Sequence, residues 1–96
     1  MIQNAYSIKD AKANVFSAPF FSINDQVAQR SFEQAKNDPN TTINQNPQDF
    51  SLYRLAVFDD QSGELHPEKQ PYYLSTASTP PVEEEKVPSF EQYVES

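Results

Sequence analysis

The sequence has no cysteine and no tryptophan, and it has one histidine and one glycine among its 96 residues. The lack of cysteine excludes a disulfide framework and a thiolate metal site. The single histidine, His66, excludes a two-histidine metal site and a Cys–His nucleophile pair within one chain. With Gly63 as its only glycine, the chain cannot form a glycine-rich loop around a phosphate. We therefore expect no cofactor, no metal site and no enzymatic activity.

Long hydrophobic runs are also missing. No apolar segment approaches the roughly 20 residues that a membrane-spanning helix needs. The first residues contain no basic region followed by an apolar one, so we expect no signal peptide, no membrane association and a cytoplasmic protein. A length of 96 residues is enough for one small domain.

Charge is distributed unevenly along the chain. Residues 1–58 hold five basic and five acidic side chains, whereas residues 59–96 hold two basic and nine acidic ones, which gives the net charge of −7. A non-specific DNA coat protein needs an excess of cations to neutralise phosphates, so this class is disfavoured. The distribution still permits a neutral core with a local basic patch beside an acidic tail.

Residues 50–58, with the sequence FSLYRLAVF, form the densest apolar run and predict a β-strand. With a period of two, one face carries Phe50, Leu52, Arg54, Ala56 and Phe58, and the other carries Ser51, Tyr53, Leu55 and Val57. Neither face is polar throughout, so we expect an inner strand with a helix on one side. Residues 59–63 predict a hairpin loop closed by Gly63. The return strand, residues 64–73, contains Pro67 and Pro71 and is therefore expected to be an edge or irregular strand.

Residues 24–36 form the best predicted helix. Ser22 or Asn24 can cap it, and Asp25 lies in the first turn, where the helix dipole favours an anion. Four apolar residues share one face at helical spacing: Val27, Ala28, Phe32 and Ala35. The sequence Asn-Asp-Pro that follows Lys36 is expected to end the helix.

The other segments of the first 75 residues are shorter. Residues 5–9 predict a first strand, and residues 15–23, interrupted by Pro19, predict an edge strand or an extended segment. Residues 37–48 predict a surface loop that Ile43 pins to the core. Together these segments predict one α+β domain, residues 1–75, in which an antiparallel sheet of three or four strands packs on one helix. A core this small is marginal, and exposed sheet edges favour a homodimer.

Residues 76–96 differ in composition and predict a disordered, acidic tail rich in proline and glutamate. Within it, residues 88–95 regain a helical pattern: Ser89 and Gln92 have capping-box spacing. Phe90, Tyr93 and Val94 share one face of that pattern. Two alternatives stay open for this segment, a frayed end and a short linear motif that binds a partner or the chain's own core.

Clusters of carboxylates are the first candidate sites. Asp59 and Asp60 lie in the predicted turn and residues 83–85 in the predicted tail, so neither cluster is expected to be buried and tuned for acid–base chemistry. Asp59, Asp60, Ser62 and Glu64 bring oxygen atoms together, as a calcium site does. Their spacing does not match the twelve-residue calcium loop, and a solvated acidic turn explains them better.

Nucleic-acid contact is the second candidate. Basic side chains converge if the first strand, the helix and the central strand are neighbours. Tyr6, Tyr53, Phe20 and Phe21 offer rings on which bases can stack, whereas Phe16, Phe32, Phe50 and Phe58 are assigned to the core. The candidate contacts for a nucleic acid or a partner are Lys9, Lys12, Arg30, Tyr53 and Arg54.

Two segments resemble the small nonstructural protein of gokushovirus-type microviruses, which are bacteriophages with circular single-stranded DNA genomes. They are FSINDQVAQRSF, residues 21–32, and NPQDFSLYRLAVFDDQSGEL, residues 46–65. The positions that match the family pattern are Asn24, Asp25, Ala28, Arg30, Phe32, Pro47, Asp49, Phe50, Leu52, Tyr53, Phe58, Asp59, Ser62 and Gly63. The opening residues 6–10 also fit, and the resemblance covers about residues 5–74. Ala56 departs from the pattern, because the family has glycine there, and this loss predicts a regular strand in place of a β-bulge.

The resemblance implies a non-enzymatic phage nonstructural protein that acts in viral single-stranded DNA replication or packaging in the host bacterial cytoplasm. It would bind single-stranded DNA weakly, or bind viral replication or packaging proteins. The alternative is an interaction adaptor that binds a host protein through its acidic tail.

Overall fold

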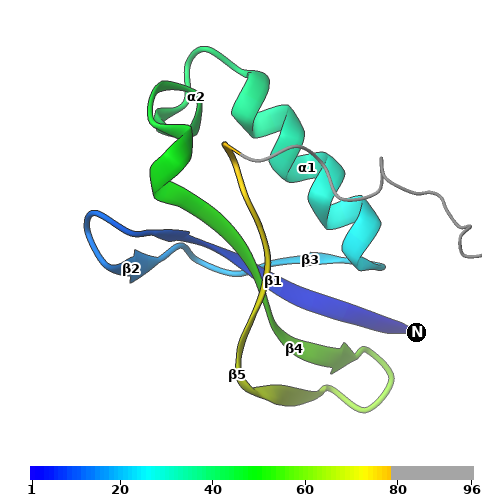
Figure 1. The fold of residues 1–96 in the computed structure, drawn as a ribbon. Coiled ribbons are helices and arrows are strands. Elements are labelled where there is room, and N and C mark those ends of the chain that lie inside the picture. The colour runs from blue at the N-terminus through cyan, green and yellow to red at the C-terminus, as the bar shows by residue number, and fades with distance from the viewer. Residues whose placement is uncertain (79–96) are drawn as a thin grey trace, which may run out of the picture.

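The computed structural model describes residues 1–78. Its elements are β1 (Ile2–Asp10), β2 (Val15–Phe16), β3 (Phe20–Ser22), α1 (Asp25–Asn37), α2 (Thr42–Gln45), the 3₁₀ turn η1 (Pro47–Asp49), β4 (Phe50–Asp59) and β5 (Glu64–Thr76). All strand pairs are antiparallel, in the order β2-β1-β4-β5, and β3 also pairs with β1. Figure 1 shows α1 lying across one side of this curled sheet. The predicted α+β architecture is therefore confirmed.

One edge of the sheet is a single extended segment that Pro19 interrupts. β2 pairs with the end of β1 and β3 pairs with its middle, so both short strands lie on the same side of β1. Between them, Ser17 continues the ladder: its N–H donates to the carbonyl of Ile8 (2.9 Å), and its hydroxyl accepts from the N–H of Ile8 (3.0 Å). The expected edge strand is thus present in two pieces.

The predicted hairpin joins β4 to β5. Gly63 has φ of +78°, a conformation that residues with a side chain rarely adopt, and its N–H donates to the carbonyl of Asp59 (2.8 Å). β5 runs three residues further than the predicted return strand and is irregular as expected. It leaves the regular register between Pro67, which pairs with Ala56, and Tyr72, which pairs with Arg54.

A β-bulge at Leu55 corrects the predicted faces of the central strand. Tyr6 pairs with Arg54 and Ala5 pairs with Ala56, so Leu55 is an extra residue opposite β1. Because two residues of β4 oppose one of β1, the alternation reverses at this point. Arg54 lies on the helix side with Leu52, as predicted, but Ala56 and Phe58 lie on the opposite side. The bulge is present although Ala56 stands where the microvirus pattern has glycine, so the regularised strand expected there is wrong.

Helix α1 begins at a side-chain cap and is held to the sheet by its buried face and a hydrogen bond. Asn24 is the N-cap, and its side-chain oxygen accepts from the N–H of Val27 (2.9 Å). Ala28 and Phe32 are the buried residues of the helix, on the face predicted from spacing. The hydroxyl of Ser75 in β5 donates to the side-chain oxygen of Gln29 (2.7 Å), which ties the helix to the sheet.

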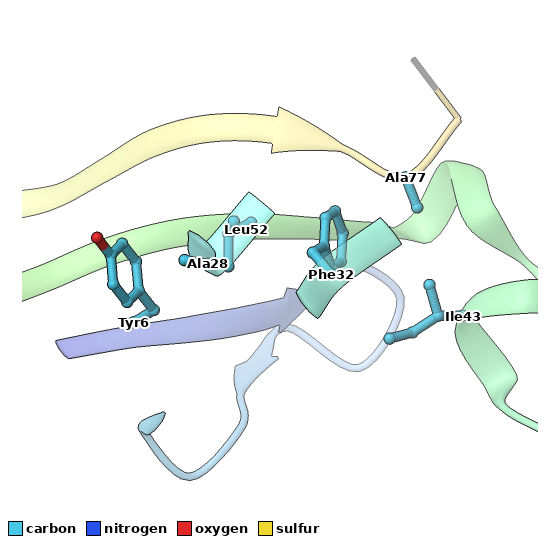
Figure 2. Packing of buried hydrophobic residues seen from close by; sticks show 6 residues of the cluster. All are labelled: Tyr6, Ala28, Phe32, Ile43, Leu52 and Ala77. Atoms are coloured by element: carbon cyan, nitrogen blue, oxygen red, sulfur yellow. The ribbon is translucent and has the colours of Figure 1, made fainter. Parts of the chain in front are cut away.

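The core lies between α1 and the sheet. Figure 2 shows its buried residues extending from Tyr6 at one end to Ile43 at the other; the full set is Tyr6, Ala28, Phe32, Ile43, Leu52 and Ala77. Ile43 comes from α2, in the predicted loop, and pins that loop as expected. Ala77 is buried two residues beyond the predicted domain end at residue 75, and its N–H donates to the carbonyl of Phe50 (2.9 Å).

The aromatic residues divide differently from the prediction. Of the four assigned to the core, Phe32 is buried and Phe50 packs against the cluster, but Phe16 is 41% exposed and Phe58 is on the far side of the sheet. Conversely, Tyr6 is fully buried, with its ring 5.8 Å from that of Phe20. The bulge explains Phe58, and the short β2 strand explains Phe16, because its pairing with Lys9 turns the ring away from α1.

Candidate functional site

The side of the sheet that faces away from α1 is the candidate site, and we call it the open face. Strand register places these residues on it: Gln3, Ala5, Ser7, Lys9, Phe16, Phe21, Ser51, Tyr53, Ala56, Phe58, Leu65, Pro67, Tyr73 and Thr76. Lys9 is the only charged residue in this set. A sheet face with one cation, no carboxylate and several aromatic rings is unusual in a chain with a net charge of −7.

Three aromatic rings from three strands form a row in one half of the open face. We call Phe16, Tyr53 and Tyr73 the ring row. The centroids of Phe16 and Tyr53 are 5.4 Å apart, and those of Tyr53 and Tyr73 are 5.7 Å apart, both in edge-to-face geometry. Lys9 Nζ lies over the Phe16 ring, 5.5 Å from its centroid. The row thus ends in a cation and presents rings that remain partly exposed.

The other half of the open face is purely apolar. The rings of Phe21 and Phe58 are 5.5 Å apart, and Leu65 pairs with Phe58 across β4 and β5. Beneath the rings lie Ala5 and Ala56, which are paired and buried. We call Phe21, Phe58 and Leu65 the apolar patch. Phe21 and Leu65 are 47% and 56% exposed.

Arg54, one of the predicted contacts, lies on the helix side of the sheet and is already paired. Its Nη1 contacts Asp25 Oδ2 (2.7 Å), and its Nε contacts Glu68 Oε2 (2.8 Å). The guanidinium also lies over the ring of Tyr72, with Cζ 4.5 Å from the centroid. The hydrogen bonds to Glu68 and then Asp25 raise the pKa of Arg54. Two carboxylates therefore neutralise this arginine, and it joins α1, β4 and β5.

Tyr6 extends this polar cluster into the core. Its hydroxyl donates to Asp25 Oδ1 (2.6 Å) and accepts from the side-chain amide of Asn4 (3.0 Å). Burial raises the pKa of the Tyr6 hydroxyl, and the hydrogen bond to the Asp25 carboxylate raises it further. The phenol therefore stays a hydrogen-bond donor at every physiological pH. The Asp25 carboxylate accepts from both the Tyr6 hydroxyl and the Arg54 guanidinium.

The predicted basic residues do not form one patch. Lys9 is on the open face, Arg54 is on the helix side, and Arg30 is exposed on α1. Lys12 follows β1 and lines a shallow hollow. The other residues of that hollow are Asp10, Thr42, Asn46, Asp49 and Phe50. Of the five predicted contacts, only Lys9 and Tyr53 lie on the same face.

Sequence reasoning missed two members of the ring row. Phe16 was assigned to the core, and Tyr73 was treated only as part of a return strand. Counting residues back from the hairpin turn does not pair Tyr53 with Tyr73, because the irregularity between Pro67 and Tyr72 shifts the register of β5. The tail residues Phe90, Tyr93 and Val94 lie outside the described residues.

The carboxylates of the acidic turn make contacts within the chain. Asp59 is partly exposed, and its carboxylate accepts from the backbone N–H of Gln61 (2.9 Å), which lowers the pKa of Asp59. Asp60 pairs with the amino group of Met1. Within residues 1–78, no three His, Cys, Asp or Glu side chains are placed to hold a metal ion, and no helix there is long and apolar enough to cross a membrane.

Comparison with known families gives one match. The sequence model described as "Phage ORF5 protein" matches residues 3–79, which is most of the chain. The chain belongs to the phage ORF5 protein family. No curated protein and no solved structure matches this ORF5 family member. The matched range of this ORF5 protein covers all the described residues except the first two.

Proposed function

We propose that this phage ORF5 family protein is a non-enzymatic accessory protein of a gokushovirus-type microvirus, and that it acts in viral DNA replication or packaging in the host cytoplasm by binding single-stranded DNA. One observation carries the proposal. The ring row, with Lys9 at its end, lies on a sheet face where register places no carboxylate. Single-stranded bases stack on such rings whatever their sequence.

Stacking supplies most of the expected affinity. A base stacked on an aromatic side chain typically contributes about 1–3 kcal/mol. Tyr73 is 51% exposed, so its ring face is available without a change in the fold. The hydroxyl of Tyr73 shares a 2.7 Å hydrogen bond with Thr76, which holds the ring in place before DNA arrives. A ring that is already ordered loses little entropy on binding.

Phosphate contacts contribute much less. Lys9 is the one cation that register places on the open face, so about one phosphate is neutralised there. For single strands the salt slope is about −0.7 per phosphate. A fourfold rise in salt should therefore weaken binding only about threefold. Binding of this kind is weak and barely salt-dependent, as expected for an acidic accessory protein that must release its strand.

The polar groups on the helix side support a non-enzymatic role. Asp25 and Glu68 share Arg54 as their counter-ion. Both carboxylates are occupied by the same guanidinium, so neither is free to take part in acid–base chemistry. This cluster supports a structural role, joining helix and sheet behind the binding face.

Fluorescence anisotropy with a labelled single-stranded oligonucleotide tests the proposal. Tyr73→Ala removes one ring of the row and should weaken binding about tenfold. Tyr72→Ala is a matched control: Tyr72 is the next residue, is 53% exposed, and points to the helix side. The control should bind within about twofold of the natural protein, because its ring stacks on Arg54 and not on DNA.

The outcomes distinguish binding of DNA from binding of a protein partner. Loss of binding in Tyr73→Ala alone supports the ring row. Equal loss in both variants, or no binding by the natural protein at low salt, contradicts direct DNA binding. In that case capture of viral replication or packaging proteins on the same face is the remaining route to the proposed role.

A further inference from the structure

The last strand of the sheet ends beside the ring row. Thr76 is the final residue of β5, and its hydroxyl shares hydrogen bonds with the hydroxyls of Ser51 (2.8 Å) and Tyr73 (2.7 Å). Ser51 pairs with Thr76 on one side and with Lys9 on the other, so Lys9 lies two strands away, at about 10 Å. Residues 79–96, which we call the C-terminal segment, therefore follow a point at the edge of the open face.

The sequence of the C-terminal segment complements the chemistry of the open face. The segment contains five glutamates and one lysine, which gives it a net charge of −4 out of the −7 of the whole chain. Register places Lys9 and no carboxylate on the open face, so an acidic segment meets attraction there and no direct repulsion. The same segment contains two aromatic residues, Phe90 and Tyr93, and Val94 follows them. It therefore offers both the charge and the apolar side chains that this face can accept.

The order of these residues along the chain matches the order of the two surfaces on the sheet. The acidic run, residues 83–85, begins five residues beyond Ser78, and five extended residues span about 17 Å. This length exceeds the roughly 10 Å to Lys9. The nearer part of the C-terminal segment can therefore contact the cation.

The apolar patch lies further along the strands. Phe58 follows Ser51 by seven residues of β4, which corresponds to about 23 Å. Phe90 follows Ser78 by twelve residues, and twelve extended residues span about 40 Å. The farther, apolar part of the C-terminal segment can therefore contact the farther, apolar part of the open face.

Attachment to the same chain makes a weak contact sufficient. Phe21 and Leu65 of the apolar patch are 47% and 56% exposed, and contiguous apolar side chains of this kind commonly mark an interaction surface. A segment joined by a short linker acts at an effective concentration in the millimolar range. A second copy of the chain has no such advantage, and its net charge of −7 opposes association.

We propose that the C-terminal segment of the same chain occupies the open face. Its acidic run lies at Lys9, and the apolar patch is covered by Phe90, Tyr93 and Val94. The segment crosses the ring row and competes with single-stranded DNA for the same rings. The contact itself needs no DNA, but this regulatory consequence rests on the proposed function. DNA then binds only those molecules whose face is free, which raises the apparent Kd by the reciprocal of the free fraction.

Paramagnetic relaxation enhancement tests the contact in the full-length protein without DNA. The natural chain has no cysteine, so Ser96→Cys carries a nitroxide spin label at a single position, two residues beyond Val94. The amide signals of Phe58 and Leu65 should lose intensity. The amide signal of Arg30, which is exposed on α1, should be affected much less. No loss at any of these positions, or an equal loss at all three, would overturn the contact.

A mixed sample distinguishes the chain's own segment from that of a second copy. Half of the molecules carry only the isotope label, and the other half carry only the spin label. A contact within one chain predicts no selective loss of intensity in this mixture. A loss as large as that in the doubly labelled protein would contradict a contact within one chain.

Phe90→Ser combined with Tyr93→Ser removes both aromatic rings of the C-terminal segment and leaves the net charge at −7. This double variant should abolish the selective loss of intensity. Val82→Ser is the matched control, because Val82 is an apolar residue of the same segment outside the group assigned to the patch. It should keep the selective loss. Equal behaviour of the two variants would contradict the assignment of Phe90 and Tyr93 to the patch.

Fluorescence anisotropy with labelled single-stranded DNA measures the competition. The double variant should bind DNA about three- to tenfold more tightly than the natural protein, as expected if the C-terminal segment occupies the face in most molecules. Because the net charge is unaltered, such a gain would not come from weaker repulsion of phosphates. Val82→Ser should bind as the natural protein does. An unchanged affinity in the double variant would overturn the competition.

The two measurements keep this proposal apart from the proposed function. If Tyr73→Ala loses DNA binding but the spin label causes no selective loss of intensity, the contact is overturned and the ring row stands. If the selective loss is present but no variant binds DNA, the contact is supported and direct DNA binding is contradicted.

Discussion

The two sides of this sheet are made from the same strands but have opposite chemistry. The helix side buries Leu52 against Phe32 and pairs Arg54 with two carboxylates. The open face carries Lys9 and a series of rings that contact one another edge to face or at a tilt, with Lys9 over one of them. Packing and charge pairing account for Leu52, Phe32 and Arg54 on the first side. On the second side they leave the exposed rings unexplained, and that is why we propose binding there.

The largest effect should come from the core on the helix side. Phe32→Ala removes a buried ring between α1 and the sheet. Losses of this kind cost about 3–5 kcal/mol because a cavity remains. Urea denaturation followed by circular dichroism should show a large fall in the free energy of unfolding, or no cooperative transition at all. A loss below about 1 kcal/mol would show that the helix contributes little to the fold.

Arg54→Ala should have the next largest effect. It leaves Asp25 and Glu68 without their shared counter-ion in a partly buried site. Exposed ion pairs contribute under about 1 kcal/mol. Breaking a fully buried ion pair costs about 3–5 kcal/mol. For this partly buried site we expect the free energy of unfolding to fall by about 2 kcal/mol, between these limits. Arg30→Ala, on the exposed side of α1, is the control and should change stability by less than about 0.5 kcal/mol. Equal effects on stability would mean that Arg54 is not a structural residue.

Tyr6→Phe should have a smaller, pH-dependent effect. At pH 7 it removes the hydrogen bond to Asp25 and should cost about 1 kcal/mol. Because the folded protein raises the pKa of Tyr6 above its ordinary value near 10, the unfolded chain loses this proton first. The stabilisation is complete below pH 10 and declines above it in the natural protein only. Thermal unfolding from pH 7 to 11 should therefore show the two proteins converge; a constant difference would contradict the role of the hydroxyl.

Tyr73→Ala on the open face should have the smallest effect on stability. Its ring is exposed and contacts Tyr53 by one edge, so we expect a change of at most about 1 kcal/mol in the free energy of unfolding. The same variant should have the largest effect on DNA binding. A variant that loses DNA binding but keeps its free energy of unfolding is the sharpest test of the difference between the two sides. A large loss of stability would place Tyr73 among the structural residues.

The sequence was sufficient where local chemistry decides the structure. The cap at Asn24, the helical spacing of Ala28 and Phe32, and the single glycine at Gly63 each act within a few residues. They predicted α1 to within one residue at each end and placed the hairpin correctly. The pinning of the loop by Ile43 followed from one apolar residue in a polar stretch.

The sequence was insufficient where strand register decides which side chains share a face of the sheet. The bulge at Leu55 reverses the side on which Phe58 lies, and no local signal marks it, because the expected glycine is replaced by Ala56. Likewise, Phe16 and Tyr73 join Tyr53 only through the pairing of three strands. The candidate site is therefore a product of register, which a single sequence does not reveal.

The order of the strands also sets the order in which the chain can fold. β1 occupies an inner position in the sheet, yet its long partner β4 is made only after the helix, and Ile2 pairs with Asp59. At synthesis rates of about 5–20 residues per second, β1 waits for seconds with only β2 and β3 as local partners. The nascent chain can close the short β1–β3 hairpin and α1 early, but the open face is complete only when the β4–β5 hairpin has been made. The last third of the described chain thus decides when the open face is complete.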